Sequence, residues 1–232
     1  GALMPFCRVH SVLYGPRQGP WSFNDDVSRH ARRVLRRRYR LLPYLLSLTR
    51  EANATGKPLW RPLWMHHDVP ASATTLAQQQ FLLGEQLLCA PVVDKGVRKK
   101  QVWLPAGASW IELRSGKVFG GGAVVDVDAP VGELVVFVKG GAGFFSIGAA
   151  MNAEQTLQQR LALEILAPSS TPPASTPTLE NGVSRFGLWQ LRATVRDDDG
   201  ALHVRFDVDE QGFSPAQREI ELRLPRGFSV AA

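Results

Sequence analysis

The sequence predicts a chain with two kinds of architecture, an α/β part followed by an all-β part. Residues 1–88 alternate apolar runs with segments whose apolar residues recur at helical spacing, which is the rhythm of a parallel α/β sheet or barrel. From residue 89 onward, short alternating runs are separated by turn residues, a pattern typical of antiparallel sandwiches and barrels. The composition of the 232 residues, 44% hydrophobic and 21% charged, fits a globular protein and excludes a disordered chain.

The first strand–helix unit is expected at the start of the chain. Residues 1–7 form an apolar strand candidate, and residues 8–23, with two prolines and two glycines, form a loop. Asn24 can cap a long helix because its side chain can accept a backbone N–H, and the two aspartates that follow it suit the helix dipole. Gly56 is a suitable end for this helix, and Pro43, which lacks an N–H, is expected to kink it.

The second unit is shorter. Residues 58–65 predict a buried strand, residues 66–75 a loop, and Thr75 the N-cap of a helix over Leu76–Leu88. Two strand–helix units are too few to close a barrel. The chain also starts at Gly1, inside what resembles a strand, without the pattern of a signal peptide. We therefore expect the chain to be a piece of a longer protein.

The second part of the chain is predicted to be all-β. Its first strand candidates are Ala90–Val93, Gln101–Leu104, Trp110–Leu113, Val124–Val127 and Leu134–Val138. Residues 154–166 combine a Gln-rich start, which favours a helix, with an alternation that favours a strand. The Pro/Ser/Thr-rich segment 167–178 is interpreted as a loop or linker. Three further alternating segments indicate a second small β domain: Leu188–Val195, Leu202–Val208 and Glu219–Leu224.

The formal charge of +6 is unevenly distributed. Residues 1–60 carry eleven basic and three acidic side chains, whereas the rest of the chain carries 16 basic and 18 acidic ones. Six of the arginines share one face of the first helix: Arg29, Arg32, Arg33, Arg36, Arg37 and Arg40. Such a face can bind nucleic-acid phosphates, or it can be the solvated, salt-bridged outer face of a helix packed on a barrel. Because no known nucleic-acid-binding motif accompanies it, we interpret it as a solvated face and expect no nucleic-acid partner. No run of about 18 apolar residues is present, so no membrane partner is expected either.

His66, His67 and Asp68 form the cluster that could suggest a metal site. Adjacent residues of an extended segment point in opposite directions, so all three rarely reach one ion, and no further Cys or His pair lies nearby in the sequence. We therefore interpret the cluster as a surface loop and predict no metal site.

Cys7 and Cys89 lie in apolar runs and are expected to be buried free thiols.

Arg8 and His10 follow the first strand candidate. At alternate positions of an extended chain they share one side, and at the C-terminal end of a barrel strand that side faces the active site. From the residues alone, a purely structural histidine is an equal alternative. The acidic residues that precede the all-β part are Asp25, Asp26, Glu51, Asp68 and Glu85. All of them fall on helices, helix starts or a loop, and not at two strand ends, so no catalytic residue is predicted in this chain.

A set of short motifs follows in a fixed order along the first 142 residues. They are GALMPFCRVHS at 1–11, GPWSF at 19–23, RRYRLLPYLLSLTREANATGK at 37–57, RPLW at 61–64, QFLLGEQLLCAPV at 80–92, VWLP at 102–105 and VVFVKGG at 135–141. Each motif alone is weak. Their shared order resembles the C-terminal part of glycoside hydrolase family 31, the α-glucosidase and α-xylosidase family. Residues 143–232 carry no such motif.

The resemblance implies a fold for each part of the chain. Residues 1–88 would be the last part of a (β/α)8 barrel, from strand 7 to helix 8, and the arginine face would be the outer face of helix 7. Residues 89–142 would form a proximal β-sandwich domain and residues 143–232 a distal β domain. The expected fold is thus multidomain α/β plus all-β: a C-terminal fragment of a (β/α)8 barrel followed by two small antiparallel β-sandwich domains.

The resemblance also implies a retaining α-glycosidase that hydrolyses terminal α-linked glucosides. Such enzymes use two carboxyl groups, which in the family are aspartates on earlier barrel strands. The missing N-terminal half of the barrel would therefore be the partner of this segment within the same polypeptide, and the segment alone would be inactive. His10 would hydrogen-bond hydroxyls of the oligosaccharide or α-glucoside substrate, and Arg8 would brace the loop or contact the site. No metal or organic cofactor is implied. The alternatives are an α-xylosidase or transglycosylase of the same family, and a non-catalytic carbohydrate-binding β module.

Overall fold

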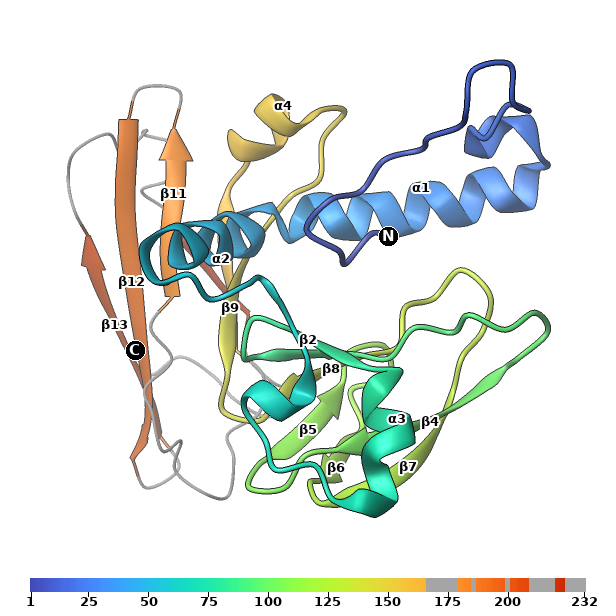
Figure 1. The fold of residues 1–232 in the computed structure, drawn as a ribbon. Coiled ribbons are helices and arrows are strands. Elements are labelled where there is room, and N and C mark those ends of the chain that lie inside the picture. The colour runs from blue at the N-terminus through green and yellow to red at the C-terminus, as the bar shows by residue number, and fades with distance from the viewer. Residues whose placement is uncertain (166–178, 185–186, 199–200, 209–219, 224–232) are drawn as a thin grey trace.

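A computed structural model describes residues 1–165, 179–184, 187–198, 201–208 and 220–223. Two helices, α1 (Asp25–Arg40) and α2 (Leu42–Thr55), follow one another across the molecule, and a group of short strands lies below them (Figure 1). The N-terminal segment runs alongside α1 and ends in a protruding loop before that helix starts. The helices therefore form the layer against which both the N-terminal segment and the sheets are arranged.

The two helices begin and end where the sequence predicts. The Asn24 side chain accepts the backbone N–H of Val27 at the start of α1, at 2.9 Å. Gly56 ends α2 with a φ of 75°, a left-handed conformation that glycine adopts without a steric penalty. The expected kink is a full break, because α1 stops at Arg40 and α2 starts one residue before Pro43, whose missing N–H cannot continue the ladder.

The predicted strand over residues 1–7 is wrong. This segment consists of turns and extended backbone, and its Leu3 side chain packs into the core beside Leu41 and Tyr44. Within residues 1–88, all of which the structure describes, the strands pair antiparallel, so the parallel pairing expected from the strand–helix rhythm is not formed there. A strand is stable only when a neighbouring strand satisfies its N–H and C=O groups, and the described residues provide none beside this segment.

The predicted helix over Leu76–Leu88 is also wrong. α3 (Thr74–Gln78) ends after five residues, and the chain continues into an antiparallel hairpin of β2 (Phe81–Leu83) and β3 (Leu87–Cys89). Every residue of both strands is buried. A run that is apolar on both faces does not distinguish a buried strand from a buried helix by periodicity. Gly84, with a φ of 63° between the two strands, is the turn signal within this run.

The hairpin belongs to a six-stranded sheet in the order β1-β2-β3-β8-β5-β6, in which all neighbours are antiparallel. Its other strands are β1 (Trp60–Arg61), β5 (Ser109–Glu112), β6 (Val118–Gly120) and β8 (Val136–Lys139). A separate antiparallel pair consists of β4 (Lys99–Leu104) and β7 (Ala123–Asp128). The sheet and the pair share one core, in which Trp103 and Trp110 are buried. These tryptophans are therefore packing residues and offer no exposed face for a sugar.

The predicted strands in this region are largely confirmed. β4, β5, β7 and β8 overlap the expected segments, whereas β6 was not predicted because its residues, Val118–Gly120, are only partly buried and lack a clear alternation. The expected strand over Ala90–Val93 is wrong in position: β3 ends at Cys89, and exposed loop residues follow Ala90. The antiparallel pairing expected from residue 89 onward is thus present over residues 89–139, with β2 and β3 included in it, but one parallel pair further along the chain departs from it.

The rest of the described chain adds two small sheets. β9 (Gly143–Ile147) pairs antiparallel with β10 (Leu161–Ile165), which pairs in parallel with β14 (Ile220–Arg223). α4 (Ala153–Leu157) precedes β10, so the mixed segment contains both the helix and the strand that its sequence suggested. The other sheet is antiparallel and contains β11 (Leu179–Ser184), β12 (Gly187–Asp198) and β13 (Ala201–Val208), beside α2 in Figure 1. The predicted linker 167–178 lies outside the described residues.

One hydrophobic cluster joins the helices to the sheets. It contains residues from the N-terminal segment, both ends of the α1–α2 break, the β2–β3 hairpin, β8, β9 and β10. At its centre the Tyr44 ring lies 6.0 Å from the Phe144 ring, and the Tyr44 hydroxyl donates to the Leu83 carbonyl oxygen at 2.8 Å. Burial raises the pKa of Tyr44 far above its usual range. The end of the helical layer is therefore packed into the same core as the strands.

Candidate functional site

Arg8 and His10 lie side by side on the exposed N-terminal segment. The Nη2 atom of Arg8 is in hydrogen-bond contact with Nδ1 of His10. A guanidinium has only donors, so Nδ1 must accept with its lone pair and the proton of the neutral ring must be on Nε2. The pair therefore presents an imidazole in one tautomer, with an Nε2–H donor on the side away from Arg8.

Arg38 attaches this segment to helix α1. Its Nη1 atom donates to the carbonyl oxygens of Ala2 at 2.9 Å and Met4 at 2.6 Å, and its Nη2 atom donates to that of Pro5 at 3.0 Å. We did not single out Arg38 from the sequence, because it lies off the predicted arginine face. The signal that could have found it is its place in the RRYRLLPYLL motif.

A group of apolar side chains between residues 6 and 23 is exposed. It consists of Phe6, Val9, Val12, Leu13, Tyr14, Trp21 and Phe23. Tyr14 is 98% exposed and Trp21 81%, and α1, which the structure describes in full, has no buried residue along its 16 positions. Large apolar residues that are exposed together mark an interaction surface. Within the described chain nothing covers them, and we call this group the N-terminal apolar surface.

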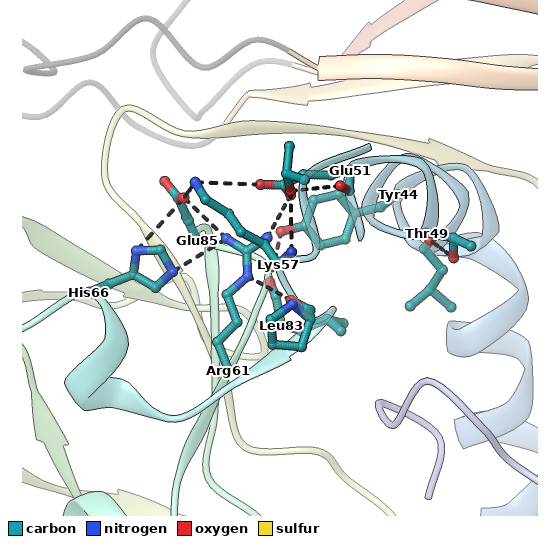
Figure 2. A network of polar contacts seen from close by, with 11 residues as sticks. Tyr44, Thr49, Glu51, Lys57, Arg61, His66, Leu83 and Glu85 are labelled. Carbon is teal, nitrogen blue, oxygen red and sulfur yellow. Dashed lines mark hydrogen bonds and ion pairs between the residues drawn. The ribbon is translucent and has the colours of Figure 1, made fainter. Parts of the chain in front are cut away.

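A second arginine–histidine group lies inside the molecule (Figure 2). Arg61 is fully buried, and its guanidinium forms ion pairs with Glu51 at 2.6 Å and Glu85 at 3.1 Å. Its Nε atom donates to the Pro58 carbonyl oxygen at 2.8 Å. Lys57 approaches the same two carboxylates at 3.9 and 3.7 Å. A buried charge is tolerated only when it is paired and hydrogen-bonded, and this group, here called the Arg61 cluster, meets that condition.

His66 is a member of the Arg61 cluster and has partners at both ring nitrogens. Its Nε2 atom lies 3.3 Å from Nη1 of Arg61, and its Nδ1 atom lies 3.7 Å from a Glu85 oxygen. Burial lowers the pKa of His66 below its usual value, an effect that the nearby Glu85 opposes. The cluster joins the end of α2, β1 and the β2–β3 turn, and its carboxylates are already paired. It therefore acts as a structural tie.

The neighbouring His67 packs on the core. Its ring meets the Trp110 ring edge-to-face at 6.3 Å, and burial lowers the pKa of His67 to about 4. Asp68 is exposed. Among the residues that the structure describes, no group of three His, Cys, Asp or Glu side chains is placed to hold a metal ion. His66, His67 and Asp68, the three residues that could have suggested a metal site, therefore lie in different surroundings.

The arginine face of α1 was predicted to be solvated and salt-bridged, and both features are present. Arg33 and Arg37 form ion pairs with Glu133 at 2.7 and 2.5 Å, and Arg40 pairs with Glu164 at 3.2 Å. Burial opposes ionisation of Glu133, but the two guanidiniums outweigh it and hold the pKa of Glu133 below its usual value. Half of the face therefore docks α1 on the loop before β8 and on β10, while Arg32 and Arg36 remain exposed.

The cysteines are free thiols, as predicted. Cys89 is buried and Cys7 is half-buried. Burial raises the pKa of the Cys89 thiol far above its usual range, which makes it unreactive. In the described part of the chain, no helix has the length and apolar character needed to cross a membrane.

Comparison with known proteins adds to these observations. Residues 1–48 match the family model of the glycosyl hydrolases family 31 TIM-barrel domain, and residues 56–142 match that of the family 31 C-terminal domain. A probable glucan 1,3-α-glucosidase of Arabidopsis thaliana is 39% identical over 142 residues, or 61% of this chain and 15% of the relative. A probable α-glucosidase of Oryza sativa subsp. japonica is 30% identical over 254 aligned residues, which cover 100% of this chain and 28% of the relative.

A solved structure extends the similarity to the distal part. The GH31 dextranase of Flavobacterium johnsoniae, in complex with glucose, matches 90% of this chain with a TM-score of 0.76 and 25% identity, and the match covers 27% of the dextranase chain. The present chain thus spans between 15% and 28% of the length of the relatives compared. The two family models together match more than half of its residues, including the Arg8–His10 segment, and the chain belongs to glycoside hydrolase family 31.

Proposed function

We propose that this chain is the C-terminal part of a retaining α-glycosidase that hydrolyses terminal α-linked glucosides. The observation that carries the proposal is the Arg8–His10 pair, which offers an Nε2–H donor within the stretch that matches the TIM-barrel domain. The two relatives are named as probable glucosidases, and the dextranase structure contains glucose. These names support a glucose-containing substrate.

In this proposal His10 binds substrate. Its Nε2–H donates to a sugar hydroxyl at the cleavage point, and such hydrogen bonds strengthen as the sugar ring approaches its transition state. Arg8 keeps the opposite ring nitrogen as an acceptor and thereby keeps the donor on the substrate side. Arg8 thus contributes to substrate binding through the ring that it orients. No metal or cofactor has a role in this chemistry.

The two catalytic carboxylates are proposed to lie upstream of this segment. A retaining mechanism needs two carboxyl groups about 5–5.5 Å apart across the glycosidic bond. Within the first 88 residues, Glu51 and Glu85 are paired with Arg61, and Asp25 and Asp26 lie in the first turn of α1. Asp68 lies in an exposed loop next to His67. These side chains form ion pairs, start a helix or lie in a loop, and we assign none of them as a catalytic carboxylate.

The rest of the barrel is the partner that this proposal requires. It would cover the N-terminal apolar surface and provide the neighbouring strands that residues 1–7 lack. We propose three parts, a barrel end, a proximal β part and a distal β part. We place the first boundary at about residue 56, where the match to the C-terminal domain begins, and not at residue 88, because β2 and β3 share a sheet with β8. The second boundary, near residue 142, is unchanged.

An α-xylosidase or a transglycosylase of the same family is the second candidate. A hydrogen bond from His10 to ring hydroxyls does not distinguish glucose from xylose, because the two sugars share those hydroxyls. A non-catalytic carbohydrate-binding β module is less well supported, because Trp103 and Trp110 are buried in the core. Trp189 is a third tryptophan that could stack on a sugar, but its side chain lies outside the described residues.

The test compares the 232-residue chain with the full-length protein that carries it. We expect the full-length protein to hydrolyse an aryl α-glucoside with retention of configuration, and the purified chain to be inactive. Hydrolysis by the homogeneous chain would overturn the assignment of the catalytic carboxylates upstream. A full-length protein that prefers an aryl α-xyloside would favour the second candidate. Binding of α-glucans by the 232-residue chain without any hydrolysis by the full-length protein would favour the binding module.

A further inference from the structure

We propose that Arg38 is a positioning residue. It holds the N-terminal segment, which carries His10, on helix α1 and so fixes the position of His10. This inference rests on the proposed function, since it concerns how the same site is held. Arg38 lies in the last turn of α1 and is half-buried. It makes three hydrogen bonds to one short stretch of backbone, at 2.9, 2.6 and 3.0 Å.

The hydrogen-bond acceptors of Arg38 explain why this one side chain can hold the N-terminal segment in place. The carbonyl oxygens of Ala2, Met4 and Pro5 belong to a segment that forms no strand, and in the described chain they accept no backbone N–H. A planar guanidinium with five donors can bind several carbonyl oxygens at once in a fixed geometry. Arg38 therefore provides the hydrogen bonds that a neighbouring strand would otherwise provide.

Apolar contacts also hold the start of this stretch, since Ala2 is buried and Met4 packs against the core. Leu3 is buried against the core, whereas Phe6 is 73% exposed, and Arg8 and His10 are also exposed. The chain from Pro5 to His10 thus extends away from its last anchor at Arg38. Displacement of that anchor moves every residue beyond it, and catalysis depends steeply on such displacements.

The helix that carries Arg38 is itself fixed on both sides of this residue. Arg33 and Arg37 pair with Glu133, and Arg40 pairs with Glu164. The arginine face therefore docks α1 on the β sheets, while Arg38, which lies off that face, holds the N-terminal segment. The position of His10 therefore depends on how α1 is docked on the sheets.

The main experiment is a double-mutant cycle in the full-length enzyme, measured as kcat and KM for an aryl α-glucoside. We expect Arg38→Met to lower kcat/KM by between about 10-fold and 100-fold. In a His10→Ala background the same change should cost less than about twofold, because the group that Arg38 positions is already absent. Arg36→Met is the matched control: Arg36 lies on the same helix, is exposed, and has no ion pair among the described residues. It should change kcat/KM by less than about twofold.

Arg38→Lys is a second variant, which keeps the proposal testable if Arg38→Met fails to fold. A lysine keeps the charge and can donate to one or two of the carbonyl oxygens, so we expect it to recover part of the lost kcat/KM. Equal losses in the wild-type and His10→Ala backgrounds would overturn the proposal, because they would mean that Arg38 supports the fold and not His10. A loss in Arg36→Met as large as that in Arg38→Met would also overturn it.

A readout that needs no activity separates this inference from the proposed function. Hydrogen exchange is measured on the 232-residue chain for a peptide covering residues 1–10 and for the β2–β3 hairpin. Arg38→Met should speed exchange in the first peptide and leave the hairpin unchanged. If the full-length protein cleaves no α-glycoside, the proposed function fails while this result still supports Arg38 as the anchor. Unchanged exchange in residues 1–10 would overturn the anchor itself.

Discussion

Two arginine–histidine pairs in this molecule stand in opposite surroundings. Arg61 is fully buried and is matched by two carboxylates, and both ring nitrogens of its neighbour His66 have partners. Arg8 is exposed, no carboxylate pairs with it in the described chain, and it contacts only one ring nitrogen of His10. The same two residue types therefore form a closed pair in one place, where both histidine nitrogens have partners, and an open pair in the other, where one histidine nitrogen has none in the described chain.

The difference separates a residue that holds the fold from a residue that can bind a ligand. A buried guanidinium without carboxylates would be costly, and each of the three Arg61 side-chain nitrogens has a partner within the chain. An exposed pair has no such requirement and can leave a donor for an outside molecule. Substitutions should therefore act on stability in the first group and on activity in the second. The following predictions test this contrast, starting with the largest effect on stability.

Arg61→Met should destabilise the chain most. It removes the buried cation and leaves Glu51 and Glu85 with only their longer contacts to Lys57. Because the two carboxylates are partly exposed, we expect a loss of about 2–4 kcal/mol in the free energy of unfolding. Urea denaturation gives this value. Arg98→Met is the control, since Arg98 is exposed and its recorded hydrogen bond is to the adjacent Val97 carbonyl. Equal losses for the two variants would show that the cluster is not a structural tie.

Gly84→Ala should have the next largest effect, because Gly84 adjoins the same cluster. Its φ is 63°, and a Cβ there would lie 2.3 Å from the Tyr44 hydroxyl oxygen and 2.7 Å from Cδ2 of Leu48. Gly96, with a φ of 84°, has open space around it. Gly96→Ala should therefore cost about 1 kcal/mol from backbone strain alone, and Gly84→Ala about 1–3 kcal/mol more from the clash. Thermal unfolding of both variants would show the difference, and equal melting temperatures would mean that the packing at Gly84 is looser than described.

Glu133→Gln tests the docking of α1 and depends on pH. The pKa of Glu133 is below its ordinary value of 4.5 in the folded chain, so its ion pairs stabilise the fold above that pH and are lost as the pH falls through the folded pKa. We expect a loss of about 0.5–1 kcal/mol at pH 7 that shrinks as the pH falls below 4.5 and through the folded pKa. Denaturation at several pH values measures it. A loss that stays constant down to acid pH would mean that the carboxylate charge is not its source.

Arg8→Ala and His10→Ala should have the smallest effect on stability. Both side chains are exposed, and their hydrogen bond is to one another. We expect each variant to change the free energy of unfolding by less than about 0.5 kcal/mol. Urea denaturation of the 232-residue chain is again the measurement. A loss comparable to that of Arg61→Met would mean that the exposed pair is also a structural element.

The sequence predicted the features whose signals are local. The Asn24 cap and the Gly56 end follow from the chemistry of single residues, and the structure confirms both, whereas the kink expected at Pro43 is a break between two helices. The proximity of Arg8 to His10 follows from the two-residue repeat of an extended chain, and it too is confirmed. The family resemblance, drawn from motif order, is confirmed by the two family matches.

The features that depend on distant contacts could not be predicted in the same way. The β2–β3 hairpin was taken for a helix because an apolar run buried on both faces has no diagnostic period. The ion pairs of Arg33 and Arg37 with Glu133 join residues about one hundred positions apart, and no local pattern signals such a contact. Arg38 was overlooked for the same reason, since its acceptors are backbone carbonyl oxygens, which any sequence provides.

The most direct test of the contrast between the two pairs is the activity of His10→Ala beside that of His66→Ala in the full-length enzyme. Loss of one sugar contact corresponds to roughly 1–3 kcal/mol, or about 5-fold to 150-fold in kcat/KM for an aryl α-glucoside. We predict a decrease in this range for His10→Ala and a change of less than about threefold for His66→Ala. An unchanged kcat/KM in His10→Ala would contradict the assignment of the open pair to substrate binding.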